Sequence, residues 1–309
     1  MLKYFRDILP IAVLIISIPA FSQEKCALWV TENFNRPVLT KKNISIEGRS
    51  ALELLEHNAS IETSYGGGFV NSVNGIKSGA DKGKKCDWFY YANGVMAHIG
   101  AAGYFPKDGD IIWWDYHSWS DGVYVSSVIG SFPQPFIGGR QEAICPTVIY
   151  TIERLMQASG MLKKNLDNLG VKNVSIRPFN KDAVFDYSKN IYIVIGPWQE
   201  LKSHRFIHGI YRNSKKTGFY AEFDEDSIRG LNFDGTPSAE RFKEGALILA
   251  AKLGFGRDNP IWFVTGTDDG PVEKAVLLLV NDPGRIKFHA AVILSENTVI
   301  GLPYYNEKK

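Results

Sequence analysis

The sequence predicts an α+β N-terminal domain followed by an α/β layered domain with a largely parallel sheet. Three observations favour this fold class. Strand patterns surround one helix in residues 23–120, strands and helices alternate over residues 148–309, and three prolines lie in residues 121–147 between them. A chain of 309 residues with 45% hydrophobic and 22% charged residues has the length and composition of two folded domains.

The first 22 residues have the features of a secretory signal peptide. Lys3 and Arg6 precede an almost wholly apolar run over residues 8–21, which is too short to span a membrane comfortably. Ala20 and Ser22 are the small residues expected before a cleavage site. We therefore expect cleavage after Ser22 and a secreted or cell-envelope location. An uncleaved membrane anchor is the alternative.

Charge and cysteine content narrow the choice of partners. A net charge of +2 gives no electrostatic case for nucleic acid, and membrane contact is expected only through an uncleaved signal. The three cysteines are too few and too far apart for a zinc site, but two of them can pair in an oxidising compartment. Sequence leaves all pairings of Cys26, Cys86 and Cys145 open. We favour a Cys86–Cys145 disulfide, because each of the two lies at an edge of a structured segment.

The elements of residues 23–120 follow in the order strand, strand, helix, strands. Strands are expected in "CALWVTENF" and "KKNISIEG", and "RSALELLEHN" is a helix whose capping box pairs Ser50 with Glu53. In "CDWFYYANGVMAHIG", Asn93 and Gly94 form the type I′ turn of a strand pair. The turn "PKDG" then opens the strand in "DIIWWDYHSW".

Residues 121–147 are expected to be an ordered connector and residues 148–309 an α/β domain of no recognised family. The connector has a strand candidate over residues 123–129 and two phenylalanines that argue against a loose linker. In the second domain, strands are expected in "TVIYTIERL", "NVSIRPF", "NIYIVIG", "GFYAEFD" and "PIWFVTG". Helices are expected near 161–169, 198–211 and 271–280, and another from a Thr236 cap to Gly254. A strand or hairpin, "KFHAAVILSENTVIGLP", closes the chain.

Three stretches of the first domain resemble the transcobalamin C-terminal-like domain family, which has a β-grasp-like fold. They are the Gly-rich strand "YGGGFVNSVNGI", the hairpin "DWFYYANGVMAHIGAAGY" and the strand "KDGDIIWWDYHSW". Their spaced combination is more specific than any one of them, and the family has a helix like that of residues 50–58 upstream. The resemblance extends over residues 26–120 and implies a β-grasp-like first domain.

The same resemblance implies binding of a small ligand outside the cell. In animal cobalamin carriers this domain closes over one face of a corrinoid, so a corrinoid or another planar molecule is the expected ligand. We recognise no counterpart of the large helical domain with which those carriers cover the other face. The expected ligand-binding residues are Tyr65, Gly66, Gly67, Gly68, Phe69, Tyr91, Asn93, Trp113, His117 and Trp119.

The strand over residues 111–119 is aromatic on both of its faces. By alternation, one face holds Ile112, Trp114 and Tyr116, and the other holds Trp113, His117 and Trp119. One face can pack on the helix of the domain. The other leaves two interpretations open, contact with a ligand or packing against the rest of the chain.

Metal and enzyme signals are weak. A corrinoid cobalt can take an imidazole ligand, so His98 and His117 are candidates, and His204 and His208 share a helix face without a third ligand. The loop "VTGTDDGPVEKA" places N–H groups at a helix start, but its two aspartates favour capping over anion binding. No Gly-x-Ser-x-Gly elbow is present, and paired carboxylates such as Asp224 and Asp226 are the remaining acid–base candidates.

We therefore expect an exported, non-catalytic protein that binds a small ligand and no metal. The first alternative is a cell-envelope structural or protein-interaction module, in which the aromatic residues only join the domains. The second is a hydrolase with its site in the C-terminal domain, at the strand ends near Gly196 and Gly266.

Overall fold

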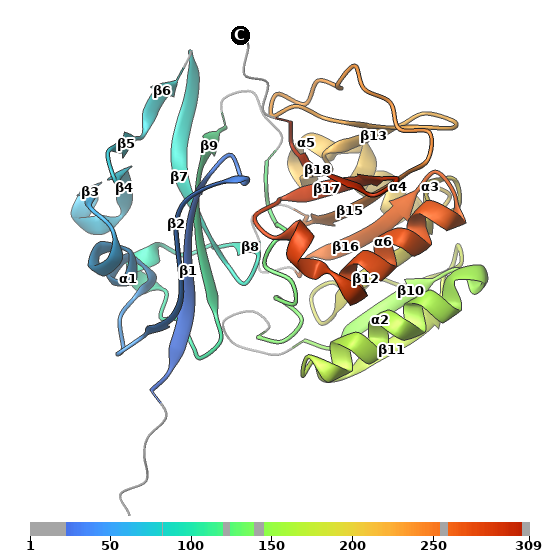
Figure 1. Ribbon diagram of the computed structural model, residues 1–309, viewed down its shortest axis with the longest axis horizontal. Helices are drawn as coiled ribbons and strands as arrows, with labels where there is room; N and C mark the ends of the chain where they lie inside the picture. Colours follow the sequence, from blue (N-terminus) through green and yellow to red (C-terminus); the bar gives the residue numbers. More distant parts are fainter. Residues whose placement is uncertain (1–22, 82, 120–123, 139–144, 254–258, 305–309) are drawn as a thin grey trace, which may run out of the picture.

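The structure is a computed structural model and describes residues 23–81, 83–119, 124–138, 145–253 and 259–304. The expected signal peptide, residues 1–22, lies outside the described residues. The fold is mixed α+β, with most of its strands in several sheets and few helical residues. Figure 1 shows the two larger sheets side by side, one in each half of the molecule.

The sheet of the first half has six strands, and two parallel strands form its centre. β1 (Lys25–Glu32) pairs in parallel with β9 (Ile111–Ser118), and the other ladders are antiparallel. The path along the sheet is β2 (Arg36–Ser45), β1, β9, β7 (Lys84–Ala92) and β6 (Gly79–Asp81), and β8 (Val95–Met96) pairs with β7. One face is covered by α1 (Ala51–Asn58), η2 (Ala101–Gly103) and a small sheet of β3 (Ile61–Ser64), β4 (Phe69–Val73) and β5 (Ile76–Lys77).

Two local signals in this half are confirmed. The capping box of α1 is complete, because Ser50 Oγ accepts from the backbone N–H of Glu53 and the Glu53 carboxylate accepts from the Ser50 N–H at 2.7 Å. Asn93 and Gly94 have φ angles of 53° and 77°, as a type I′ turn requires. A Cβ atom on Gly94 would lie 2.8 Å from the Val128 carbonyl oxygen, so this turn also packs closely on the connector.

The sheet of the second half has seven strands, and three of its ladders are parallel and three antiparallel. Its order is β11 (Val174–Pro178), β10 (Thr147–Thr151), β12 (Ile191–Pro197), β16 (Ile261–Gly266), β15 (Gly245–Ala251), β17 (Ala291–Ser295) and β18 (Thr298–Leu302). The ladders from β11 to β16 are parallel, and those from β16 to β18 are antiparallel. The expectation of a largely parallel sheet therefore holds for one side of the sheet only.

Helices cover both faces of this sheet. One face carries η3 (Glu153–Leu155), α2 (Met156–Asn168), α6 (Asp269–Asn281) and η4 (Pro283–Ile286). Figure 1 shows α2 and α6 side by side on that face. The other face carries α3 (Trp198–Leu201), α4 (Arg205–Arg212), α5 (Ser214–Thr217) and the hairpin of β13 (Ala221–Phe223) and β14 (Ile228–Gly230).

The prediction of a helix between Thr236 and Gly254 is wrong. Thr236 lies in a tight turn that Asp234 caps, since Asp234 Oδ1 accepts from the Thr236 N–H at 2.9 Å. The apolar run that follows is β15, and all of its residues are buried between β16 and β17. A strand covered on both faces has no alternation of polar and apolar residues, so its pattern does not separate it from a buried helix.

The second face of the first sheet is buried against the second half. We call the contact the junction core; it is one continuous cluster of buried residues that includes Trp29, Phe34, Tyr91 and Trp113 from the first half, Val125 and Val128 from the connector, and Phe219, Tyr220 and Phe233 from the second. The strand expected over residues 123–129 forms only one isolated bridge, between Val95 and Ser127, among the described residues. The remainder of the described connector packs under α2 and α6 through Ile129 and Phe136.

Phe34 offers a test of the junction core. Its ring is buried against Tyr91, Trp113 and Phe233, so Phe34→Ala should lower the free energy of unfolding by about 3–5 kcal/mol. Chemical denaturation followed by far-UV circular dichroism measures the loss. Phe105→Ala is the control, because that ring is 59% exposed and its removal should change stability by about 0.5 kcal/mol or less. Equal losses in the two variants would contradict a shared core.

Candidate functional site

The expected ligand-binding residues do not form one open surface. Tyr91, Asn93, Trp113 and His117 are buried, three of them in or beside the junction core. Tyr65, Phe69 and Trp119 are exposed, at 91%, 36% and 48% of their surface. Tyr65 to Gly68 lie beside α1 and Trp119 follows β9, so the exposed residues belong to different parts of the first domain. Ligand binding by these ten residues stays a prediction.

The centre of the junction is the carboxylate of Asp115 on β9. Its Oδ1 accepts hydrogen bonds from the Thr31 hydroxyl and, at 2.8 Å, from the backbone N–H of Phe34. Its Oδ2 lies 2.8 Å from His117 Nδ1. The Trp113 indole N–H donates to Thr31 Oγ1 at 2.7 Å, so Trp113, two residues before Asp115 on β9, belongs to the same network. Strand alternation places these side chains on one face, as the sequence predicts for Trp113 and His117.

Aromatic rings enclose His117 on the side away from Asp115. Ring centroids lie 4.5 Å away for Phe89, 4.9 Å for Phe34 and 5.9 Å for Phe233. Phe233 belongs to the second half, so both halves contribute to the enclosure. The ring of His117 is 3% exposed, and its Nδ1 pairs with the Asp115 carboxylate.

Burial raises the pKa of the Asp115 carboxyl above its usual range, although the bonds from His117, Thr31 and Phe34 act in the opposite direction. A paired carboxylate and imidazole is an arrangement that orients a general base. Here neither side chain lines the pocket at the start of β1 or the pocket beyond the carboxyl end of β12. Asp115 and His117 therefore form a buried polar pair within a hydrophobic interface.

Asn93 has a structural partner that the sequence did not indicate. Its side chain donates to Asp110 Oδ1 at 2.8 Å and accepts from the Ile111 N–H at 2.9 Å. The Lys107 N–H and the Tyr104 hydroxyl donate to the other oxygen of Asp110. These bonds tie the type I′ turn to the turn that opens β9.

The Gly-rich loop presents Tyr65 to solvent. It comprises η1 (Tyr65–Gly67) and Gly68. Tyr65, Gly66 and Gly67 have φ angles of 53°, 65° and 89°, so three successive residues are left-handed. A Cβ atom on Gly67 would lie 2.8 Å from a methyl carbon of Leu52, which shows how closely the loop approaches α1. The left-handed conformation at this position favours glycine.

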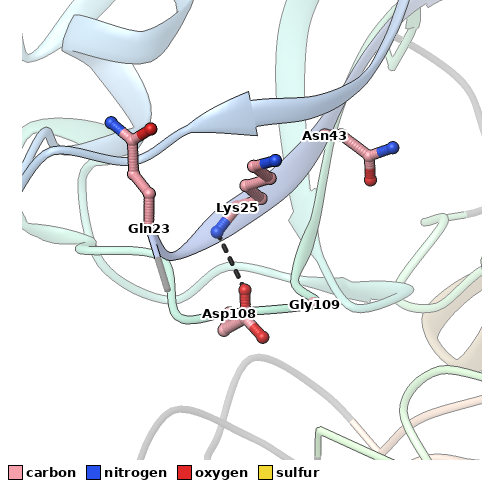
Figure 2. A pocket seen from close by; sticks show the side chains of 5 residues that line it. All are labelled: Gln23, Lys25, Asn43, Asp108 and Gly109. Atoms are coloured by element: carbon pink, nitrogen blue, oxygen red, sulfur yellow. Dashed lines mark hydrogen bonds between the residues drawn. The ribbon is translucent and has the colours of Figure 1, made fainter. Parts of the chain in front are cut away.

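A shallow pocket of about 510 Å³ lies at the start of β1, and Figure 2 shows its lining. The lining residues are Gln23, Lys25, Asn43, Asp108 and Gly109. The backbone N–H of Lys25 donates to Asp108 Oδ1 at 2.8 Å, so the one carboxylate of the pocket already has a partner. No sequence pattern marks this hollow.

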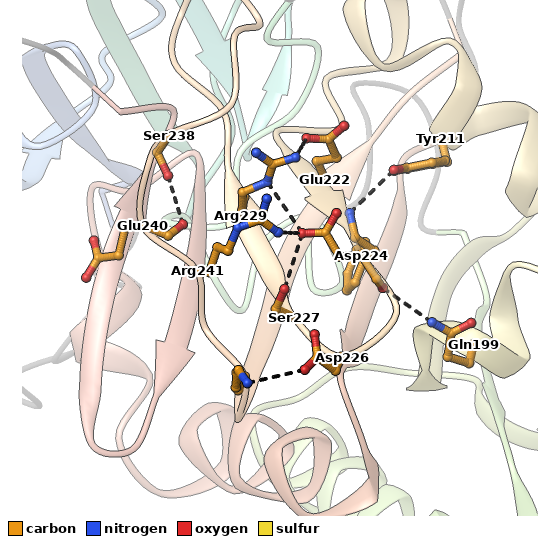
Figure 3. A network of polar contacts seen from close by, with 12 residues as sticks. Gln199, Tyr211, Glu222, Asp224, Asp226, Ser227, Arg229, Ser238, Glu240 and Arg241 are labelled. Atoms are coloured by element: carbon orange, nitrogen blue, oxygen red, sulfur yellow. Dashed lines mark hydrogen bonds and ion pairs between the residues drawn. The ribbon is translucent and has the colours of Figure 1, made fainter.

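A second shallow pocket, of about 550 Å³, lies beyond the carboxyl end of β12. It is lined by Gln199, Lys202, Phe223, Asp224, Glu225, Asp226 and Arg241. Figure 3 shows that Arg229 and Arg241 converge on Asp224, and that Gln199 holds the tip of the β13–β14 hairpin through a backbone carbonyl. Lys243 pairs with Asp226 at 3.5 Å. These pairs make Asp224 and Asp226 members of a charge network.

Of the strand ends named for a hydrolase, the one at Gly196 is closely packed by neighbouring side chains. A Cβ atom on Gly196 would lie 3.1 Å from Leu201 and 3.2 Å from Ile152. Arg154 forms ion pairs with Asp269, at 2.6 Å, and with Glu200. The charged groups near β12 and β16 therefore pair with one another.

His204, Cys86 and Cys145 each have a polar partner in the structure. His204 is buried and its Nε2 lies 2.9 Å from the Ala183 carbonyl oxygen. In the described part of the chain, no group of three His, Cys, Asp or Glu side chains is arranged to hold a metal. The expected Cys86–Cys145 disulfide is not formed: none of the three described cysteines is in a disulfide. Cys145 accepts from Asn259 and Cys86 contacts the Lys84 carbonyl, so each sulfur is occupied within its own half.

Among the described residues, no helix combines the length and the apolar character needed to cross a bilayer.

Comparisons with known proteins match parts of this chain. Residues 48–118 match a family model described as a domain of unknown function, DUF4430. No curated protein matches the chain. A proposed metal binding protein from Ruminococcus gnavus is similar over 31% of this chain and 99% of its own, with 16% identity and a TM-score of 0.27. Haptocorrin in complex with Cbi is similar over 32% of this chain and 26% of its own, with 14% identity and a TM-score of 0.24.

Asp115 offers a test by pH. Because its pKa is raised in the folded state, that state binds the proton more tightly than the unfolded chain does. The contribution of this group to stability is therefore full below about pH 4 and is lost as the pH rises through the raised pKa. Asp115→Asn should flatten this part of the curve of unfolding free energy against pH, measured by urea denaturation. Asp182→Asn, the same change at an exposed site, should leave the curve unchanged, and an unaltered slope in Asp115→Asn would refute the assignment.

Proposed function

We propose that the protein is an exported, non-catalytic binding protein, and that the Gly-rich loop carrying Tyr65 contacts a small planar ligand such as a corrinoid. The observation that carries the proposal is the 91% exposure of the Tyr65 ring on a left-handed backbone. The loop lies inside the stretch that resembles the transcobalamin C-terminal-like family and inside the region matched by DUF4430. Export is inferred from the basic and apolar pattern of residues 1–22.

Tyr65 is hard to explain by folding alone. A left-handed conformation costs a non-glycine residue about 1 kcal/mol or more, and the exposed ring contributes little burial in return. Sparsely populated conformations of this kind are concentrated at binding sites, where the surrounding structure maintains them. Flat aromatic ligands pack on an exposed ring and on glycine backbone with little steric hindrance.

The proposal also includes a more specific assignment of the fold of each half. We infer a β-grasp-like first domain from the α1-covered sheet and its central parallel pair, and an α/β layered second domain from the helices on both faces of the seven-stranded sheet. In this arrangement the face opposite α1 is used by the junction core, so a ligand has access to the loop and to the outer rim of the first domain.

One observation favours a second candidate, a structural or protein-interaction module of the cell envelope. Trp113 and His117 are covered by the second half of the chain, which is the role that this alternative gives to the aromatic face. The two candidates differ in what they expect of Tyr65. A module that only joins its own domains has no use for an exposed ring on a strained loop.

A ligand screen tests the proposal. Thermal unfolding of the full chain is measured with cobinamide, cyanocobalamin and haemin, and at least one should raise Tm at saturating concentration. Tyr65→Ser should weaken the binding of that ligand about tenfold through loss of ring contact, with little change in the Tm of the free protein.

The control is Phe105→Ser, which removes an exposed ring from another loop and should leave binding unchanged. No stabilisation by any of the three compounds would reject the planar-ligand function. Stabilisation that survives Tyr65→Ser would place the ligand elsewhere on the protein.

A further inference from the structure

A lysine from the second half rests on aromatic rings from both halves. Lys287 follows η4, and its Nζ lies 4.7 Å from the ring centroid of Trp29 and 4.4 Å from that of Phe288. The rings of Trp29 and Phe288 pack edge to face with centroids 4.9 Å apart. The half-buried Lys287 ammonium is thereby held at the edge of the junction core.

A second lysine approaches the same place from the first half. Trp29 on β1 pairs with Thr40 on β2, and Lys42 lies in the β-bulge that follows, opposite Ala27. Ala27 packs against the junction core, which places Lys42 on the junction side of the sheet. Burial lowers the pKa of Lys287, and the charge of Lys42 lowers it further.

This edge contains donors without matching acceptors. Among the described residues, neither Lys42 nor Lys287 forms an ion pair with a carboxylate. The indole Nε1 of Trp29 is buried and has no hydrogen-bond partner there. Buried donors in folded proteins are normally paired, and neighbouring like charges destabilise each other. An oxyanion supplies what both kinds of group lack, because it accepts charge-assisted hydrogen bonds and neutralises positive charge.

We propose that a small oxyanion, such as a phosphate, sulfate or carboxylate group, binds between Lys42 and Lys287 at the edge of the junction core. The ligand would be held by one cation from each half, so it would also stabilise the contact between the halves. The site lies on the junction side of the first sheet and the Tyr65 loop lies on the α1 side, so this proposal is independent of the planar ligand.

The test uses the full chain and three salts. Tm is measured during titration with sodium phosphate, sodium sulfate and sodium acetate, with sodium chloride at equal ionic strength as the reference. Sulfate and phosphate also stabilise folded proteins without binding a site, so the expected signature is a rise in Tm that saturates and is reduced in Lys42→Gln. The three salts separate phosphate and sulfate from carboxylate ligands. Lys287→Met and Lys42→Gln should each weaken the apparent affinity about tenfold or more.

The matched control is Lys41→Gln, which removes the same charge one residue away. Lys41 pairs with Leu28, whose side chain belongs to the core under α1, so Lys41 lies on the other face of β2. It should leave the affinity within about twofold, as expected for a distant surface charge. Lys287→Arg keeps the charge and should retain binding, which protects the test if Lys287→Met fails to fold.

A second readout follows the ring beneath Lys287. The indole N–H resonance of Trp29, assigned by its loss in Trp29→Phe, should shift on titration of the wild-type chain and stay in place in Lys42→Gln. The proposal is overturned if chloride stabilises as much as every oxyanion, if no salt shifts the resonance, or if Lys41→Gln loses as much affinity as Lys42→Gln.

Discussion

The buried carboxylate of Asp115 is the constraint on which the rest of the structure depends. It joins a side chain of β1, the main chain of the β1–β2 connection and the imidazole of His117. A carboxylate removed from water and then deprived of a partner costs several kcal/mol, so each of these groups fixes the position of the others. The N–H bond is of particular value at Phe34, whose φ of 63° is rare for a bulky residue. It holds that ring over His117 and against Phe233 of the second half.

The aromatic second face of the first sheet follows from this arrangement. The second half contributes Phe288 to the same contact. Its φ of 65° is equally unusual, and its ring packs on Trp29 and Trp113. Each half thus inserts a phenylalanine from a left-handed backbone into the other. Apolar area covered in this way stabilises by about 25 cal/mol per Å², which offsets the strain at both positions. The halves are therefore joined by a core with the burial of a domain interior.

Sequence patterns predicted what depends on neighbouring residues and missed what depends on distant ones. The capping box of α1, the Asn93–Gly94 turn and the alternation along β9 are local, and each is found. β15 was mistaken for a helix because a strand buried on both faces has no alternation. Sequence alone leaves open whether a ligand or the rest of the chain covers the face that carries Trp113 and His117. Phe233 and Phe288, more than a hundred residues along the chain, cover this face, and no local sequence pattern predicts that either does so.

The two proposed sites lie on opposite faces of one strand, and this sets how they can communicate. On β1, Trp29 faces the junction and Lys287, whereas Leu28 and Val30 face the core under α1, on which the Tyr65 loop rests through Leu52. Energetic coupling between sites needs an element with two discrete arrangements that both ligands bias. A strand paired on both sides and buried on both faces offers few alternatives, because a slip by one residue would exchange its two cores. The loop and the junction edge should therefore bind independently, and any coupling would have to be reciprocal, with each ligand changing the affinity of the other by the same factor.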